Sequence, residues 1–305
     1  MIVVTGLRKR FGSIAAVDGI DLTVNRGEIF GIVGPDGAGK STLLRILAAI
    51  MIPDEGRVTI DGADVQHQPY AVKERIAYMP QRFGLYEDLT VEENIIFFGK
   101  IYRLTRSEIR GRLDMLYGFS RLGPFKDRLA GNLSGGMKQK LGLACCLVHT
   151  PDLLLLDEPT NGVDPVSRRE FWDILYDLLS RRVTVVVSTA YLDEAERCNR
   201  VALMHRGRFI RLGGPKAIRS EGGATAIRMI VSDALRAESV LKSDERFAGW
   251  KRTGHALRFV SEDALTDARR ARTLLARHGV KITSIEKQVP SLEDSFIRVV
   301  GEDGT

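Results

Sequence analysis

The hydrophobic pattern along the first eighty residues indicates short strands mixed with one helix. An apolar strand over 28–33 runs into a glycine-rich stretch, and a helix is expected from Lys40 to about Ile50. Shorter strand-like segments lie at 2–7, 20–24, 57–60 and 75–79. The first two of these segments are short and strand-like, and we expect them to form part of a small antiparallel sheet.

From 88 to 149 the pattern changes to a helical period. Thr90 with Glu93, and Thr105 with Glu108, have the spacing of a capping box, in which two side chains satisfy exposed backbone N–H groups at a helix start. An apolar stripe follows at Ile109, Leu113 and Leu116. This stretch predicts a helical insert in the fold.

Buried strands return after the helical insert. Residues 153–156 form an apolar run without alternation, as in a central parallel strand covered on both faces, and 183–187 has the same pattern. Between them, Asp164-Pro165 can cap and open a helix with one apolar face. Alternating strands and helices predict an α/β fold, in which a mostly parallel sheet is flanked by helices and preceded by the antiparallel β subdomain.

Two glycine pairs, Gly213-Gly214 and Gly222-Gly223, bracket a short helix and mark a domain boundary. We therefore expect a first domain over 1–221 and a second over 222–305. In the second, strands are expected at 224–231, 247–252, 256–260 and 281–286, and helices at 234–241, 263–278 and 291–299. The βαββαβ order predicts a small ferredoxin-like α+β module, and the pattern places no catalytic cluster in it.

The composition is that of a globular protein with one large and one small domain, since 44% of the 305 residues are hydrophobic and 28% are charged. No window holds the roughly 18 uninterrupted apolar residues that a membrane span requires. The first residues, Met1 to Arg8, lack the charged leader and apolar core of a signal peptide. A cytoplasmic location is therefore expected.

A net charge of +6 fits either attraction to an anionic partner or a solvated surface rich in arginine. The charge is dispersed, without a long basic run, so we favour the second interpretation and expect no nucleic-acid partner. Cys145 and Cys146 are adjacent and Cys198 is isolated. Without a CxxC pair, a metal or disulfide role is disfavoured.

The stretch Gly34-Pro35-Asp36-Gly37-Ala38-Gly39-Lys40-Ser41 matches the phosphate-loop pattern GxxxxGK[ST]. Its glycines let the backbone curl so that N–H groups point inward, and the following helix offers its positive end. Lys40 is expected to reach the β and γ phosphates, and Ser41 to offer a hydroxyl to Mg²⁺. Alone, this loop indicates only that a nucleoside triphosphate binds.

Two further motifs follow the phosphate loop: Asn132-Leu-Ser-Gly-Gly-Met-Lys-Gln-Lys140 and Leu153-Leu-Leu-Leu-Asp-Glu-Pro-Thr160. The three motifs in this order resemble the ATP-binding cassette (ABC) ATPases that drive transporters. The resemblance covers roughly 1–214 and implies that the first domain, 1–221, is an ABC ATPase domain with a helical subdomain over about 88–149.

Asp157 and Glu158 end an apolar strand, where a hydrolytic enzyme of this architecture carries its carboxylates. Asp157 is expected to hold Mg²⁺ with Ser41, and Glu158 to polarise the attacking water. By the resemblance, Gln81 also senses Mg²⁺ and couples the site to the membrane partner. The expected catalytic residues are Glu158, Gln81 and Lys40.

The resemblance further implies that Phe11 stacks on adenine and that Thr42 touches the α phosphate. Asp36 stands where the family usually has asparagine.

Ser134, Gly135 and Gly136 open another helix, whose N–H groups form a second anion-binding end. The resemblance implies that this end faces the γ phosphate bound by another subunit, and that Asp164 belongs to the D-loop joining the two sites. Two cassettes would then close head to tail over two ATP molecules, as a homodimer or a heterodimer.

The family usually has Ser-Thr-His after the strand that ends near 187, but this sequence has Ser188-Thr189-Ala190. Alanine cannot donate the hydrogen bond that the histidine gives to the γ phosphate. Loss of one preorganised donor lowers the rate by about 10² to 10³ on the oxyanion-hole precedent. We therefore expect ATP binding with slow turnover, as in one half of an asymmetric pair. The first cassettes of some twin-cassette ABC-2 exporters look similar here.

Three functions remain open. The first is the energy-coupling ATPase of an ABC-2 exporter, peripheral on the inner face of the cell membrane and bound to a separate permease. The C-terminal segment of the chain, Pro290-Ser-Leu-Glu-Asp-Ser-Phe296, resembles the tail of cassettes in drug and lipid exporters of the ABC-2 type, which favours this function. The second is a soluble ATP-gated switch acting on nucleic acid or ribosomes. The third is a regulatory ATP-binding subunit with negligible hydrolysis.

Overall fold

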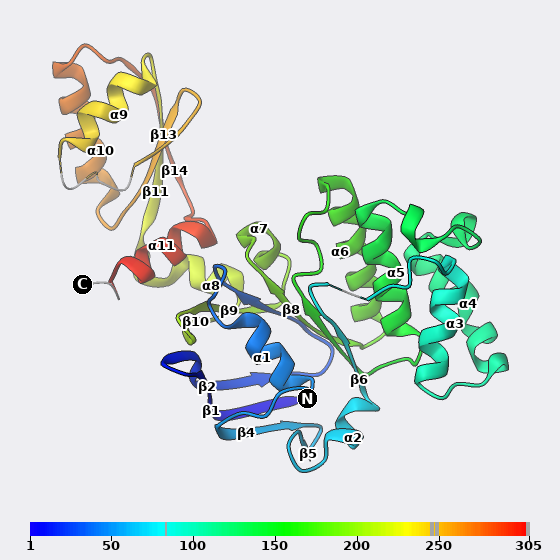
Figure 1. The fold of residues 1–305 in the computed structure, drawn as a ribbon. Helices are drawn as coiled ribbons and strands as arrows, with labels where there is room; N and C mark the ends of the chain where they lie inside the picture. Colours follow the sequence, from blue (N-terminus) through cyan, green and yellow to red (C-terminus); the bar gives the residue numbers. More distant parts are fainter. Residues whose placement is uncertain (83, 245–246, 248–249, 303–305) are drawn as a thin grey trace. The chain divides into compact units, whose positions relative to one another are not determined.

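The computed structural model describes residues 1–82, 84–244, 247 and 250–302 (Figure 1). It separates into two compact units, Met1–Gly213 and Gly214–Thr305. The sequence pattern put the boundary at 221/222, eight residues later. The difference arises because the short helix α8 (Pro215–Ser220) packs against α11 (Leu292–Glu302) and so belongs to the second unit.

A six-stranded sheet forms the centre of the first unit, in the order β10-β9-β3-β8-β7-β6. Its strands are β3 (Ile29–Val33), β6 (Ile76–Met79), β7 (Leu153–Asp157), β8 (Thr184–Thr189), β9 (Arg200–His205) and β10 (Arg208–Gly213). Only the β9–β10 pair is antiparallel, and the others are parallel. The predicted α/β class is confirmed, and the two strands after 199 are additions to the sequence-based prediction.

The strands β3, β7 and β8 are buried at every residue. This fits the apolar runs within them, Leu153–Leu156 in β7 and Val185–Val187 in β8, because a strand covered on both faces has no solvent side. β8 lies between β3 and β7, so the loops that follow these three strands meet at one edge of the sheet. Ligands of open α/β folds bind at this carboxyl edge.

A second sheet of the same unit is antiparallel, with the order β2-β1-β4-β5. Its strands are β1 (Ile2–Phe11), β2 (Ile14–Val24), β4 (Glu55–Ile60) and β5 (Ala63–Asp64). β1 continues four residues beyond the predicted 2–7. The extension, Arg8 to Phe11, is polar or exposed and pairs with β2 through shifted registers, so it carries no apolar alternation from which it could be predicted.

Four helices of the first unit, α3 to α6, begin directly after a residue whose side chain caps them. Thr90 and Thr105 complete capping boxes at α3 (Val91–Ile101) and α4 (Arg106–Ser120). The other long helices are α5 (Gly135–Leu147) and α6 (Pro165–Ser180), and α3 to α6 lie together in Figure 1.

The helix α1 (Lys40–Leu47) ends before the predicted Ile50, because Ala49 has a left-handed φ of 54°. A short helix, α2 (Pro69–Lys73), was not predicted. Within the described residues, none of the helices combines the length and apolarity needed to cross a bilayer.

The second unit has a four-stranded antiparallel sheet in the order β12-β13-β11-β14. Its other elements are β11 (Thr225–Val231), α9 (Ala234–Lys242), β12 (Lys251–Thr253), β13 (Ala256–Ser261), α10 (Ala264–Arg277) and β14 (Ile282–Gln288). The strand predicted over 247–252 is wrong in its start: Phe247 is buried against Trp250 and Phe259, and β12 begins at Lys251. Residues 248–249 of that prediction lie outside the described residues.

Asp64 is a buried carboxylate at the end of the antiparallel sheet, and it should make stability depend on pH. Burial alone would raise the pKa of Asp64, but the backbone N–H of Gln66 and the side chains of His67 and Arg57 hold it well below its usual range. A depressed pKa contributes stability above the unfolded-state value of about 4, and this contribution disappears as pH falls toward the folded-state value.

We therefore expect Asp64→Asn to lower the free energy of unfolding by about 1 to 2 kcal/mol at pH 7. The difference between the variant and the parent should shrink as pH falls below about 4, because the aspartate of the unfolded chain protonates there while that of the folded protein stays charged. Denaturant unfolding of both proteins at several pH values measures it. A destabilisation that is the same at pH 3 and pH 7 would show that the charge of Asp64 is not responsible.

Candidate nucleotide site

The glycine-rich loop between β3 and α1 adopts a backbone that requires glycine at two positions. Gly37 and Gly39 have φ values of 78° and 107°. A Cβ atom on Gly39 would lie 2.0 Å from the carbonyl oxygen of Ala16. The loop therefore passes against β2, and a residue with a side chain would have to move it.

This close approach yields a prediction for nucleotide affinity. Gly39→Ala should weaken ATP binding about five- to thirtyfold, because the left-handed conformation alone disfavours an L-residue by about 1 to 2 kcal/mol. Titration with a fluorescent ATP analogue measures it. Gly118→Ala is the matched control, since a Cβ there meets nothing within 4 Å and its affinity should be that of the parent. Equal affinity of both variants would mean that the loop conformation does not matter for binding.

A cavity of about 380 Å³ opens over the loop and the start of α1. Its lining residues are Ala16, Asp36, Gly37, Ala38, Gly39, Lys40, Ser41, Thr42, Gln81 and Glu158. No side chain caps the start of α1, and no acidic residue lies in its first turn. The N–H groups of that turn are thus available to an anion in this cavity.

Lys40 is buried in the cavity wall, and its ammonium group has three oxygen partners. Its Nζ lies 2.8 Å from the carbonyl oxygen of Gly34, 3.0 Å from that of Pro35 and 2.9 Å from Oε1 of Glu158. Both charged side chains are at least nine-tenths buried. A buried cation that loses one anionic partner needs another. A phosphate group entering here can take the place of the Glu158 carboxylate on Lys40.

Asp157 gathers hydroxyl groups from three different elements. Its Oδ1 accepts from the hydroxyls of Ser41 at 2.9 Å and Ser188 at 2.7 Å, and its Oδ2 accepts from Tyr78 at 3.3 Å. Burial and the nearby Asp157 charge raise the pKa of Tyr78 to about 12, so this phenol remains a donor. A carboxylate beside a hydroxyl is an oxygen donor set that suits Mg²⁺. Ser41 and Asp157 fit such an ion.

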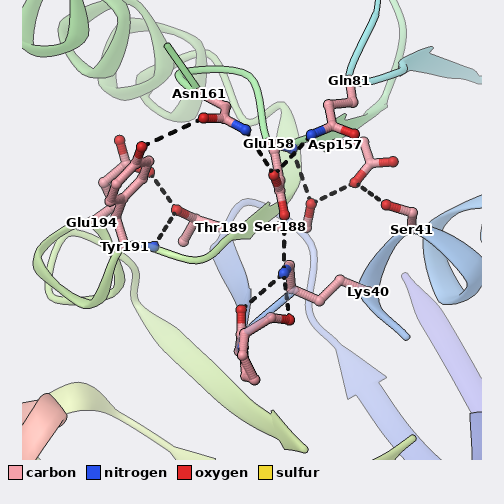
Figure 2. Close-up of polar contacts among 12 residues, drawn as sticks. Lys40, Ser41, Gln81, Asp157, Glu158, Asn161, Ser188, Thr189, Tyr191 and Glu194 are labelled. Atoms are coloured by element: carbon pink, nitrogen blue, oxygen red, sulfur yellow. Dashed lines mark hydrogen bonds and ion pairs between the residues drawn. The ribbon is translucent and has the colours of Figure 1, made fainter. Parts of the chain in front are cut away.

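Glu158 is the next residue and turns toward the cavity (Figure 2). Its Oε2 accepts from Nε2 of Gln81 at 3.1 Å and from Nδ2 of Asn161 at 3.3 Å. Its backbone N–H donates to the hydroxyl of Ser188 at 3.0 Å. The backbone of Glu158 is left-handed, with a φ of 48°, a conformation that persists in a non-glycine residue only when the surroundings hold it.

Several predicted nucleotide-binding residues do not line this cavity. Gly34 and Pro35 contribute carbonyl oxygens to Lys40 instead. Phe11, at the end of β1, is about half exposed, with the ammonium of Lys9 5.7 Å from its ring centre. An exposed aromatic face is open to stacking, but the adenine role of Phe11 remains a prediction.

Ser134 and Asp164 lie at helix starts and do not line the cavity around Lys40. Ser134 caps α5 by accepting from the N–H of Met137 at 3.3 Å, and Asp164 caps α6. A Cβ atom on Gly136 would meet the side chain of Ser167 at 2.5 Å, so the starts of α5 and α6 pack closely. Neither Ser134, Gly135 nor Gly136 lines the cavity around Lys40 within the same chain.

Ala190 borders a second, smaller cavity of about 120 Å³. Its lining residues are Asp36, Glu158, Thr160, Asn161, Thr189, Ala190 and Tyr191. Asp36 and Glu158 line both cavities. The position at which the family has histidine is therefore next to Glu158. The sequence analysis gave no role to the hydroxyls of Tyr78 and Ser188, because only the strand order brings them to Asp157. It also gave no role to the amide of Asn161 at Glu158.

Comparison with known proteins agrees with this geometry. Residues 17–161 match the family model described as ABC transporter. The chain is 40% identical over 318 residues to the probable multidrug ABC transporter ATP-binding protein YbhF of Escherichia coli K12, an alignment that covers all of this chain and 53% of that protein. It is 36% identical to the daunorubicin/doxorubicin resistance ATP-binding protein DrrA of Streptomyces peucetius, over 97% of this chain and 91% of that one. The chain thus spans about half the length of YbhF.

A solved structure has the same fold. It is a dimer of the ATP-binding cassette MJ0796 in a post-hydrolysis state, bound to ADP and Pi. The match has a TM-score of 0.63 and 28% identity, and it covers 70% of this chain and 98% of the other. In that protein the cassette is dimeric and holds the products of ATP hydrolysis.

Proposed function

Because the chain belongs to the ATP-binding proteins of ABC transporters, we propose that it binds and hydrolyses ATP to drive an ABC exporter. One observation carries this proposal. Lys40, Ser41, Gln81 and Glu158 come from three separate segments and line a single cavity at the carboxyl edge of the sheet, where Asp157 accepts a hydrogen bond from Ser41. Positioning and charge neutralisation are what phosphoryl transfer to water requires of a protein.

Within this proposal each side chain has a defined task. Lys40 exchanges the Glu158 carboxylate for phosphate oxygens when ATP enters. Ser41 and Asp157 would hold Mg²⁺, with Gln81 close by, and the ion supplies positive charge to the phosphates. Once released from Lys40, Oε1 of Glu158 is free to accept a hydrogen bond from water. Asn161 and Gln81 then hold the other carboxylate oxygen, and the carboxylate orients the water and draws on its proton.

We further propose that a second cassette completes the site. Ser134 and the two glycines after it open α5 but do not line the cavity of their own chain. The N–H groups at a helix start that does not face the cavity of its own chain can bind an anion held by another subunit. ATP would then lie between Lys40 of one protomer and Ser134 of the other, and its binding would close the dimer.

The proposed turnover at this site is slow, because Ala190 brings only a methyl group to the smaller cavity beside Glu158. A partner cassette that has a histidine in this place would carry the faster hydrolysis. The match covers 53% of the length of YbhF, so the unmatched part of YbhF is nearly as long as the matched part. That remaining length is enough for another cassette of this size, which supports an asymmetric pair.

The proposed setting is the inner face of the cell membrane, where the chain would bind a separate integral-membrane permease. The names of two relatives, a multidrug transporter protein and a daunorubicin/doxorubicin resistance protein, support export of drug-like compounds. Gln81 and the helical subdomain between α3 and α5 would transmit closure to the permease. Selection of cargo would lie in the permease.

Purification of the chain from detergent-solubilised membranes tests this function. We expect an integral-membrane protein to co-purify and the complex to hydrolyse ATP. A complex that contains a membrane protein but hydrolyses no ATP would instead support a regulatory ATP-binding subunit, a function that Ala190 favours. Co-purification with ribosomes or nucleic acid, without a membrane protein, would contradict the exporter.

A further inference from the structure

Glu194 is a fully buried carboxylate outside the cavity around Lys40. It lies in the short helix α7 (Leu192–Ala195) and has an exposed fraction of 0%. Its Oε1 accepts from the hydroxyl of Thr160 at 2.6 Å, and its Oε2 accepts from the hydroxyl of Thr189 at 2.7 Å. Nε of Arg168 lies 3.5 Å from Oε1. We call these four residues the Glu194 cluster.

The Glu194 cluster joins the two loops that border the smaller cavity. Thr160 follows Glu158 in the loop after β7, and Thr189 is the last residue of β8, next to Ala190. These strands are neighbours in the sheet, but their loops share no backbone ladder. One carboxylate, with one oxygen on each hydroxyl, thus links the two loops through their side chains.

Tyr191 provides a second connection between the same loops (Figure 2). Its backbone N–H donates to Thr189 Oγ1 at 3.0 Å, and its ring lies 4.1 Å from the guanidinium carbon of Arg168. Its hydroxyl is 3.5 Å from Oδ1 of Asn161, whose amide in turn donates to Glu158. A chain of contacts thus leads from the cluster to the carboxylate in the nucleotide cavity.

The hydrogen-bond donors of the Glu194 cluster account for the burial of a carboxylate at this position. An ionised carboxylate only accepts hydrogen bonds, and both threonine hydroxyls can donate to it. Charge-assisted bonds of this length are stronger than neutral ones. A buried carboxylate without such partners would be strongly disfavoured. The loops are held at the place where Glu158 has its left-handed backbone, which needs support from its surroundings.

We infer that Glu194 is a positioning residue for ATP hydrolysis: it ties the loop after β7 to the loop after β8, and thereby keeps Asn161 in place to orient the Glu158 carboxylate. Glu194 reaches neither of the two cavities itself. Its effect should fall on the chemical step and not on nucleotide binding. This inference rests on the proposed function, because it concerns the hydrolysis attributed to the same site.

The test compares Glu194→Gln with the parent in the complex that the chain forms, under single-turnover conditions. Both proteins carry Ala190→His to raise the measured rate. We expect the hydrolysis rate to fall about tenfold or more, since small displacements of catalytic groups have effects of this size or larger. The dissociation constant for ATP should stay within about twofold. A rate within about twofold of the parent would overturn the inference, even if the melting temperature falls.

Asp193→Asn is the matched control. Asp193 is the preceding residue, is exposed and lies 3.8 Å from the same Arg168, but it contacts neither threonine. Its replacement should leave the rate unchanged. A loss equal to that of Glu194→Gln would also overturn the inference, because it would assign the effect to charge near Arg168.

A double-mutant cycle with Thr160→Val isolates the hydrogen bond. If Thr160 acts through Glu194, the double variant should be no slower than the slower single variant. Additive losses would overturn the inference. Should Glu194→Gln fail to fold, Thr160→Val and Thr189→Val carry the test with the same expected loss of rate. A parent complex that hydrolyses no ATP contradicts the proposed function itself, and this outcome is seen before any Glu194 variant is measured.

Discussion

Replacing Glu158 with glutamine should lower ATP turnover at this site by about 10² to 10⁴-fold, the usual contribution of a positioned general base. The amide has no charge with which to draw the proton of an attacking water. Glutamine also weakens the ion pair with Lys40, which is 2.9 Å from the carboxylate. ATP should therefore bind at least as tightly as it does to the parent, because no anionic side chain competes with its phosphates.

Phosphate release from the assembled complex, together with equilibrium binding of a fluorescent ATP analogue, measures both effects. Glu87→Gln is the control, since Glu87 is an exposed carboxylate that pairs with Lys138 and should leave both quantities unchanged. Unaltered turnover in the Glu158 variant would place catalysis in another subunit. Loss of ATP affinity would show that the carboxylate supports binding and does not compete with it.

Ala190→His should increase turnover, by about 10²-fold if the imidazole supplies a donor comparable to those of an oxyanion hole. The cavity beside Ala190 is about 120 Å³ and is bordered by Glu158, so it has room for a larger side chain next to the carboxylate. Single-turnover hydrolysis, with the complex in excess over ATP, reports this site directly.

Ala190→Leu is the matched control, because leucine fills the same space without a hydrogen-bond donor. We expect no gain in rate from it. If Ala190→His leaves turnover unchanged, the alanine does not limit this site and the account of an asymmetric pair is wrong. If both variants raise turnover equally, filling the cavity and not hydrogen bonding explains the gain.

Features that depend on short sequence spacing were predicted well. The capping boxes that begin at Thr90 and Thr105, and the unbroken apolar strand before Asp157, are each determined within a few residues. The fold class followed from the alternation of such strands with helices. The phosphate loop was recognisable because glycine, lysine and serine are needed at fixed offsets.

Features that depend on strand order were not predictable in the same way. The ion pair of Lys40 with Glu158 joins residues on either side of β8, which enters the sheet between β3 and β7. The contacts of Glu194 with Thr160 likewise arise from two adjacent strand ends. Nothing in the local sequence around Glu194 distinguishes a buried carboxylate from a solvated one on an acidic helix.

Phe11 illustrates the opposite case, in which a motif gives a role that the geometry of one chain leaves open. Its ring is exposed at the end of β1 and lies outside the lining of the cavity. Ser134 is similar, since its predicted ligand would be held by another subunit. For both residues, the expected contact partner is a molecule that the amino-acid sequence of one chain does not contain.

A structure of the complex carrying Glu158→Gln, with Mg²⁺ and ATP bound, tests the central claim most directly. We predict that the triphosphate held by Lys40 of one protomer is also contacted by Ser134, or by the serine in its place, at the α5 start of a second cassette. A structure in which Ser134 lies away from every triphosphate in the assembly would contradict the proposed mechanism.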